Sequence, residues 1–488
     1  MFQMRYLSLL TVLFWCLNSR GETMSEALVR ATAAVQAATP RAQADSAHPI
    51  FHVTSPSQWI NDPNGPIFHK GFYHLFYQLD PFSDKGGVKY WGHVRSRDLA
   101  KWEQLPIAIA PSGDQGEESI WSGCCTINGR GQPMIFYTSI APGKSAFDHA
   151  EQWAATSDDD LIHWRKSPAN PVLSEALHGG RKIYDWRDPF VFKEGKKTFV
   201  VLGGHLAKNG EAVVNIYEAE NPELTKWKYR GVLFQLPDTK AGSAECPNFF
   251  KLGDKWVLFV SPYGKVRYFV GDFDVETCRF QPRTQGVLDP GNFYAPNTML
   301  VPDGRRIVWG WVNGFPNGRG WNGCLTVPRL LSFSREGELR QTPAPQLEKL
   351  RGKRTAWRNV RLDDGGETFA LPDTNTLEIL AEIDLQSATS FLLGIKSPGT
   401  NPPVTVSFNG SELKAMNAKA PLRVAKGAEK LSLRLFIDRS VLEVFANETA
   451  CITKVITPLD ANASLEIRAE GGTATAKRIQ AWPMKTIW

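Results

Sequence analysis

Residues 96–102 read SRDLAKW, and this pattern of a polar turn, a leucine and a tryptophan returns twice along the chain. The second copy, SDDDLIHW, ends at Trp164 and the third, AENPELTKW, ends at Trp227. Successive copies therefore lie 62 residues (102 to 164) and 63 residues (164 to 227) apart. A weaker copy, GDFDVETCRF, ends at Phe280. Repetition at a fixed period indicates an array of similar units, although about 60 residues is long for one propeller blade.

Each closing pattern is preceded by a polar residue and then by two apolar runs around a glycine turn, which predicts a β-hairpin. The polar residue differs from unit to unit, being in chain order Asp62, Ser122, Asp188 and Glu245. A fifth unit starts near YAPNTMLVPDGRRIVWGW at residues 294–311. The many aromatic residues, with 41 glycines and 32 prolines, agree with short strands joined by tight turns. The sequence therefore predicts an all-β fold built from five repeated units.

Three acids occupy corresponding places in these units. In a radial array the first strand of each unit lies nearest the axis, so Asp62, Asp188 and Glu245 are expected to meet there. The simpler interpretation is that each acid only begins a turn, since aspartate before proline often does so. Three acids at matched positions, each followed by proline within two residues, favour a functional site.

The pattern changes after residue 350. The charged stretch RGKRTAWRNVRL is interpreted as a connection, and short segments with two-residue alternation follow from roughly residue 358 to 488, which is typical of a β-sandwich. The predicted domains are therefore a propeller over residues 49–350 and a sandwich over residues 358–488. Within the sandwich, Glu443 in SVLEVFAN is expected to face solvent.

The beginning of the chain resembles an export signal. Arg5 precedes the apolar run YLSLLTVLFWCL, which is too short to span a bilayer but suits a signal peptide. Residues 1–48 are predicted to be a signal peptide followed by an Ala-rich helix or tether, which implies a secreted or periplasmic protein. If the chain instead starts at Met24, the protein would be cytoplasmic. No later segment is expected to cross a membrane, and the sequence leaves the oligomeric state open.

The charge pattern and the motifs exclude several classes of partner and cofactor. The net charge of +6 is small for 488 residues and the basic residues are scattered, which argues against a nucleic-acid partner. The chain has no histidine or cysteine cluster for a metal, no phosphate-binding glycine loop and no dinucleotide fingerprint, so no cofactor or metal is expected.

Glycoside hydrolysis by a carboxyl pair is the reaction that best suits three acids. Repulsion between close carboxylates should raise at least one pKa, which provides both an acid and a base. Tryptophans are expected to stack on the sugar or wall the site, the candidates being Trp59, Trp91, Trp121, Trp186 and Trp321.

Several motifs, in the correct order, resemble glycoside hydrolase family 32, the β-fructofuranosidases. They are WINDPNG at 59–65, YHLFYQ at 73–78, WSG at 121–123, WRDP at 186–189, ECP at 245–247, GWNGCLTVPRLLS at 320–332 and LRLFIDRSVLEVFAN at 433–447. The resemblance implies a five-bladed β-propeller followed by a C-terminal β-sandwich. It also implies a retaining hydrolase that releases terminal non-reducing β-D-fructofuranosyl residues from sucrose or from the fructans inulin and levan.

The same resemblance assigns roles to individual residues. It makes Asp62 the nucleophile, Glu245 the general acid/base and Asp188 the transition-state stabiliser. Arg187 is expected to keep Asp188 ionised and oriented. The resemblance places Asn61, Gln78, Ser122, Arg187, Tyr294 and Trp321 around the substrate, and Trp59, Trp91 and Trp121 are added as aromatic residues expected to line the site.

Two positions depart from the family pattern, and other functions stay open. Gly86 stands where relatives often carry tryptophan, so the preference for the leaving group does not transfer. Asn248 replaces a frequent aspartate, and one fewer negative charge predicts a smaller rise in the pKa of Glu245. The alternatives are a fructosyltransferase on the same fold, a non-catalytic carbohydrate-binding propeller and an arabinan-cleaving propeller enzyme, against which WINDPNG and the sandwich motif both count.

Overall fold

The computed structural model describes residues 21–208, 210–237, 242–398, 402–424, 430–460 and 462–488. The expected signal peptide falls almost entirely on residues 1–20, which lie outside the described residues. Among the residues that are described, no helix has both the length and the apolar character that crossing a bilayer requires.

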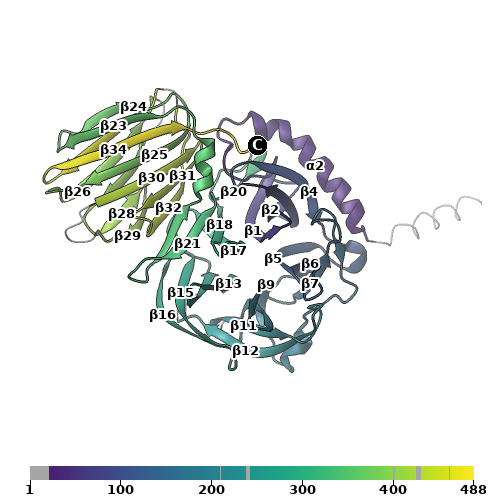
Figure 1. Ribbon diagram of the computed structural model, residues 1–488. Helices are drawn as coiled ribbons and strands as arrows, with labels where there is room; N and C mark the ends of the chain where they lie inside the picture. The colour runs from purple at the N-terminus through teal and green to yellow at the C-terminus, as the bar shows by residue number, and fades with distance from the viewer. Residues whose placement is uncertain (1–20, 209, 238–241, 399–401, 425–429, 461) are drawn as a thin grey trace, which may run out of the picture.

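Five sheets follow one another around a central axis, with their first strands innermost (Figure 1). The first sheet contains β1 (Gln58–His69), β2 (Phe72–Asp80), β3 (Tyr90–Ser96) and β4 (Trp102–Ile109). The second contains β5 (Ser119–Ile127), β6 (Pro133–Ile140), β7 (Glu151–Thr156) and β8 (Arg165–Lys166). The third contains β9 (Tyr184–Glu194), β10 (Lys197–His205), β11 (Ala212–Ala219) and β12 (Trp227–Gln235).

The last two sheets complete the ring. The fourth contains β13 (Glu245–Leu252), β14 (Lys255–Ser261), β15 (Arg267–Asp274) and β16 (Arg279–Val287). The fifth contains β17 (Phe293–Leu300), β18 (Arg306–Val312), β20 (Cys324–Leu325), β21 (Arg329–Phe333) and β22 (Leu339–Pro343). Between β18 and β20, the short strand β19 (Trp321–Asn322) leaves the fifth sheet and pairs with β1, which links the last sheet to the first. Five is the number of sheets that a five-bladed propeller requires.

The repeated sequence pattern forms a local structure. In three successive sheets the indole Nε1 of the closing tryptophan donates a hydrogen bond to the carbonyl of the leucine three residues earlier. The N···O distances are 3.2 Å for Trp102, 3.0 Å for Trp164 and 3.0 Å for Trp227, and all three indoles are buried. The repeat is therefore a turn that anchors the start of an outer strand in the blade core.

The Ala-rich stretch is a helix, one of the two structures expected for it. Helix α2 (Met24–Ala44) begins at Thr23, whose side chain forms a capping box with Glu26. Ala27 and Ala31 are buried on the face that packs against β1 and β4. The helix runs along the outside of the ring (Figure 1). The structure also contains short 3-10 helices at η1 (Gly113–Gln115), η2 (Glu175–His178) and η3 (Pro345–Leu350).

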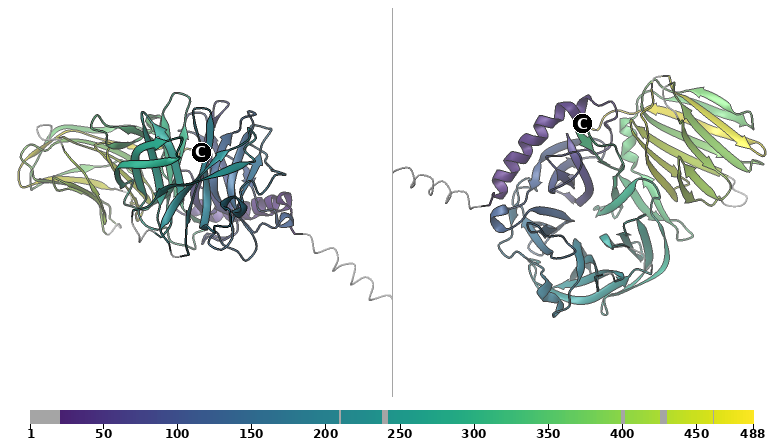
Figure 2. Two further views of the ribbon diagram at one scale, coloured as in Figure 1. Left: turned by 90° about the horizontal axis from the view of Figure 1, so that it is seen from below. Right: turned by 180° about the vertical axis from the view of Figure 1, so that it is seen from behind.

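Two six-stranded sheets form a β-sandwich beside the ring, as predicted (Figures 1 and 2). One sheet has the order β23 (Thr355–Leu362), β34 (Ala474–Pro483), β25 (Thr376–Asp384), β30 (Lys430–Asp438), β31 (Val441–Ala446) and β32 (Ala450–Val455). The other has the order β24 (Glu367–Ala370), β33 (Ser464–Glu470), β26 (Ser390–Lys396), β27 (Val404–Phe408), β28 (Glu412–Ala415) and β29 (Ala418–Pro421). Their facing side chains form one apolar core.

Glu443 does not face solvent, so that prediction was wrong. The side chain is fully buried where the sandwich meets the propeller, and it pairs with Arg329 at 2.6 Å and with His52 at 3.0 Å. Asp438 accepts from His52 Nδ1 at 2.8 Å, and Asp289 lies 3.1 Å from Arg329. Strand alternation identifies the two faces of a strand but does not reveal that another part of the chain covers one of them. The network joins the two β structures through compensated buried charges.

Stability should fall in alkaline solution because of His52. Burial alone would lower the pKa of His52, but the hydrogen bonds to Asp438 and Glu443 outweigh burial and raise the pKa to about 9. The unfolded chain binds this proton with a pKa of about 6.5, so the folded protein holds it more tightly. The resulting stabilisation is therefore complete below pH 6.5. That contribution, roughly 3 kcal/mol, is lost as the pH rises through about 9.

Thermal unfolding between pH 6 and pH 10 measures this dependence. The wild-type Tm should fall across the alkaline part of the range, whereas a His52→Gln variant should be less stable throughout and show a much flatter profile. Parallel profiles for the two proteins would contradict an ionised His52.

Candidate active site

Each of the five innermost strands carries the same irregularity. In β1, Ile60 pairs with Leu79 and Pro63 pairs with Tyr77, so two residues oppose one on the neighbouring strand. The other four strands contain the same bulge, in which two residues oppose one. The bulged residues are 121–122 in β5, 188–189 in β9, 246–247 in β13 and 295–296 in β17. A bulge redirects side chains near the end of a strand, which suits a site at the axis.

The three acids do not occupy equal positions in this bulge, which corrects the prediction that they would. Glu245 is the residue before the bulge, Asp188 is its first residue and Asp62 is its second. Asp188 and Cys246, which do occupy equal positions, have φ values of 64° and 47°. Positive φ is uncommon for residues other than glycine and is often found at functional sites.

The acids nevertheless meet at the axis of the ring. The Sγ atom of Cys246 lies 3.5 Å from Asp62 Oδ2 and 3.6 Å from Asp188 Oδ2, so one sulfur atom bridges these two carboxylates. Arg187 forms an ion pair with Glu245 and its Nε lies 3.6 Å from Asp188 Oδ2. Three carboxylates from three different sheets therefore surround one small volume.

Polar side chains from the first two sheets orient Asp62. Ser122 Oγ donates to Asp62 Oδ2 at 2.6 Å, and Asn61 Nδ2 donates to Oδ1 at 3.0 Å. Gln78 Nε2 in turn donates to Ser122 Oγ at 2.7 Å, and Trp59 Nε1 donates to Asn61 Oδ1 at 2.9 Å. Both oxygens of Asp62 thus receive hydrogen bonds, which hold the carboxylate in one orientation.

Glu245 and Asp188 have different partners. The Tyr294 hydroxyl donates to Glu245 Oε2 at 2.5 Å, while Arg187 binds Oε1. The backbone N–H of Cys246 donates to Asp188 Oδ2 at 2.8 Å. The structure thus brings Asn61, Gln78, Ser122, Arg187 and Tyr294 to the three acids, as expected from the sequence.

Burial makes two of the acids weaker. It is the largest cause that raises the pKa of Asp188 to about 7, and the Glu245 charge adds to it although Arg187 opposes it. Burial also raises the pKa of Glu245, helped by the Asp62 charge and opposed by Arg187 and Tyr294. Repulsion between the acids therefore contributes as predicted, but burial contributes more. Arg187 lowers the pKa of Asp188 without keeping it in the ordinary range.

The candidate tryptophans divide into two groups. Trp59 and Trp121 are half-buried beside the acids, and the guanidinium of Arg187 lies 5.6 Å from the Trp121 ring centroid. Trp91 is buried behind them and donates from Nε1 to the Trp121 carbonyl at 3.1 Å, so it supports the wall without lining it.

Trp186 and Trp321 lie elsewhere. Trp186 is buried in a blade core, where its ring centroid lies 4.8 Å from that of His178. Trp321 is buried against Phe315 and donates to Asp45 Oδ2 at 2.9 Å. A tryptophan next to a motif residue need not point the same way, because side chains alternate along a strand.

Three further residues of the site were not predicted from the sequence, namely Asp185, Cys246 and Tyr263. Asp185 pairs with Arg187 and accepts from Ser243 Oγ at 2.8 Å. Tyr263 accepts a hydrogen bond from Arg187 at 2.6 Å. Cys246 and Asp185 lie within two residues of a motif acid or arginine and could have been considered. Tyr263 has no comparable sequence signal.

The two departures from the family pattern have different surroundings. A Cβ on Gly86 would lie 3.3 Å from the Trp59 ring and 3.5 Å from Lys89 Nζ, so the lysine occupies space beside this glycine. Asn248 is buried, and its amide donates to the carbonyls of Cys246 at 3.3 Å and Pro296 at 3.0 Å. The bond to Pro296 joins β13 to β17.

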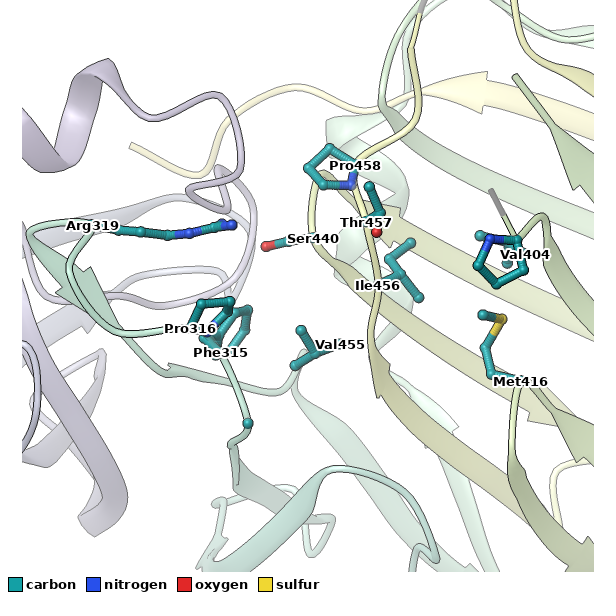
Figure 3. Close-up of a pocket in the computed structure, with 12 residues that line it drawn as sticks. Phe315, Pro316, Arg319, Val404, Met416, Ser440, Val455, Ile456, Thr457 and Pro458 are labelled. Carbon is teal, nitrogen blue, oxygen red and sulfur yellow. The ribbon is translucent and has the colours of Figure 1, made fainter. Parts of the chain in front are cut away.

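A separate cavity of about 330 Å³ lies between the propeller and the sandwich (Figure 3). Phe315, Pro316 and Arg319 line it from one side and Met416 from the other, and none of the three acids reaches it. Within the described part of the chain, no group of three or more histidine, cysteine, aspartate or glutamate side chains could hold a metal ion.

Three carboxyl groups that converge at the axis of an all-β ring, two of them with raised pKa values, are the arrangement of a glycosidase that works by carboxyl chemistry. The chain belongs to glycoside hydrolase family 32. The model of the glycosyl hydrolases family 32 N-terminal domain matches residues 52–343, and that of the family 32 C-terminal domain matches residues 346–483.

Individual relatives agree with this assignment. A sucrose-6-phosphate hydrolase of Zymomonas mobilis is 33% identical, over 86% of this chain and 88% of the relative. A levanase of Bacillus subtilis is 30% identical, over 90% of this chain and 71% of the relative. Among solved structures, a mutant of a Bombyx mori family 32 beta-fructofuranosidase in complex with sucrose is similar, with a TM-score of 0.80 and 25% identity over 94% of this chain and 98% of that chain.

Proposed function

We propose that this glycosidase is a retaining β-fructofuranosidase that removes terminal non-reducing β-D-fructofuranosyl residues from sucrose and fructans. The convergence of Asp62, Asp188 and Glu245 carries the proposal. The relatives named levanase, sucrose-6-phosphate hydrolase and beta-fructofuranosidase support the substrate class, since all three names refer to fructosides.

In the first step Asp62 attacks the anomeric carbon of the fructosyl unit. The bond from that carbon to the bridging oxygen breaks, and Glu245 gives its proton to the leaving oxygen. A raised pKa suits this role, because Glu245 must hold a proton when the substrate binds. Asp62, with hydrogen bonds to both oxygens, is preset as the nucleophile.

In the second step water replaces Asp62. Glu245, now ionised, takes a proton from water, and the hydroxyl attacks the same carbon from the side that the leaving group occupied. Two displacements restore the original configuration. Asp188 is assigned to hydrogen bonds with the fructose hydroxyls that strengthen in the transition state. Arg187 offers a positive charge between Asp188 and Glu245, which limits the repulsion when both are ionised.

Early products from sucrose, inulin and levan test this function. The purified protein should release glucose and fructose from sucrose and free fructose from one or both fructans, and an Asp62→Asn preparation handled in parallel controls for contaminating activity. Kestose-type products as the main early species would identify a fructosyltransferase. Absence of turnover on all three sugars would identify a binding propeller and contradict the proposal.

We also propose that the protein is exported, on the basis of the charged and apolar pattern in residues 1–21. The fold supports a start upstream of Met24, because Thr23 caps α2 and Glu22 pairs with Arg30 at 2.7 Å. The N-terminal sequence of the mature protein distinguishes cleavage near residue 21 from a cytoplasmic protein that begins at Met24.

A further inference from the structure

Tyr263 combines two unusual properties. It lies two residues after β14, whose last residue, Ser261, pairs with Glu245, and it is 59% exposed although it is a large aromatic residue. Its φ of 56° places the backbone in the left-handed region, which costs free energy for a residue other than glycine. A strained, exposed tyrosine beside a site calls for a reason other than core packing.

Contacts fix the position of the Tyr263 ring. Its hydroxyl accepts from Arg187 at 2.6 Å and donates to Asp185 Oδ2 at 3.4 Å, and its backbone N–H donates to the Tyr294 hydroxyl at 3.0 Å. The ring covers Gly242, where an added Cβ would lie 2.4 Å from Cδ2 of the ring. Glycine at this position therefore leaves the space that the ring fills.

These contacts place Tyr263 next to the general acid. Arg187 and Tyr294, which hold Tyr263, also bind the two carboxyl oxygens of Glu245. Glu245 must reach the oxygen between the fructosyl unit and the unit that leaves. An exposed ring attached to both partners of Glu245 is therefore adjacent to the leaving unit.

We propose that Tyr263 is a specificity-determining residue whose exposed ring forms a platform for the sugar unit that leaves. The inference rests on the proposed function, because it assigns Glu245 as the general acid. Sugar rings present apolar C–H faces that pack against aromatic rings. The ligand at this platform is a neutral sugar ring, such as the glucose of sucrose or the next fructose of a fructan. The hydroxyl contacts with Arg187 and Asp185 fix the orientation of the ring, and the tyrosine takes no part in proton transfer.

The test compares two substrates with the same fructosyl unit, sucrose and methyl β-D-fructofuranoside, whose leaving group has no ring. In a Tyr263→Ala variant, kcat/KM for sucrose should fall about 3- to 10-fold, mainly through KM. The value for the methyl fructoside should fall by a smaller factor, and by the same factor in a Tyr263→Phe variant, because both substitutions remove the hydroxyl contact with Arg187. A Tyr263→Phe variant retains the ring and should keep most of the preference for sucrose, which makes it the matched control.

Two results would overturn the platform. An equal loss of kcat/KM on both substrates would show that Tyr263 acts only through Arg187 and Glu245. An unchanged kcat/KM on both substrates would show that its ring does not contact the leaving sugar unit. Thermal unfolding of both variants verifies that the comparison concerns folded protein. If the wild-type protein hydrolyses neither fructoside, the proposed function itself fails, which is a distinct outcome from a failure of this inference.

Discussion

Replacement of Asp62 by asparagine is expected to lower kcat on sucrose by roughly 10⁴-fold or more. An amide cannot attack the anomeric carbon, whereas it can keep the size of the side chain and one of its hydrogen bonds. Ser122 Oγ and Asn61 Nδ2 each donate to one oxygen of Asp62. Because an asparagine side chain has a single acceptor oxygen, one of these two hydrogen bonds is lost. Sucrose cleavage measured by glucose release, with highly purified protein, provides the rate.

The matched control for this variant is Ser122→Ala. It removes a 2.6 Å hydrogen bond to Asp62 but leaves the nucleophile, so its loss should be far smaller than that of Asp62→Asn. Both proteins should unfold at temperatures close to that of the wild type. An Asp62→Asn protein that keeps a tenth of the wild-type rate would remove Asp62 from the role of nucleophile.

Replacement of Glu245 by glutamine is expected to lower kcat/KM on sucrose by about 10²- to 10⁴-fold, because the leaving oxygen then departs without a proton. A fructoside with an acidic phenol as leaving group needs no such proton and should lose much less in the first step. The pH profile adds a second signature. Since the pKa of Glu245 is raised, wild-type activity should fall as the pH rises through that pKa and deprotonates the acid. In the glutamine variant this alkaline limb should be absent.

The comparison of the two leaving groups separates chemistry from structure. The amide oxygen of the Glu245→Gln variant can still accept from Tyr294 or Arg187, which both bind Glu245 in the wild type, so large rearrangement is not expected. An equal loss on sucrose and on the phenyl fructoside, with an unchanged alkaline limb, would mean that Glu245 only supports the fold of the site.

The ring could be predicted from sequence because its repeated element is local. The leucine and tryptophan of each closing turn lie three residues apart and bond directly to each other, as Leu99 and Trp102 do. A periodic pattern therefore reports a structure that each unit forms by itself. The meeting of the three acids could be predicted as well, since the first strands of such units share an axis.

The details of the site could not be predicted in the same way. A bulge inserts one residue into each inner strand, and the three acids differ in their position relative to it. Glu245 precedes the bulge, Asp188 is its first residue and Asp62 its second, whereas the sequence predicted the same position for all three. Glu443 and Trp321 were placed wrongly because their partners lie far away in the chain, at Arg329 and Asp45. Such burial depends on how the sandwich and α2 pack on the ring, which strand periodicity does not describe.

If three acids act on one fructosyl unit, Asp62 forms a covalent bond to that unit during the reaction. Trapping the fructosyl-enzyme tests this bond most directly. The Glu245→Gln variant, mixed with a fructoside whose leaving group needs no proton, should accumulate a fructosyl-enzyme because the base for its hydrolysis is missing. Mass spectrometry of a peptide digest should find the added mass of one fructosyl unit on the peptide that contains Asp62. The same mass on a peptide without Asp62 would contradict the account, as would release of fructose with inverted configuration and no trapped species.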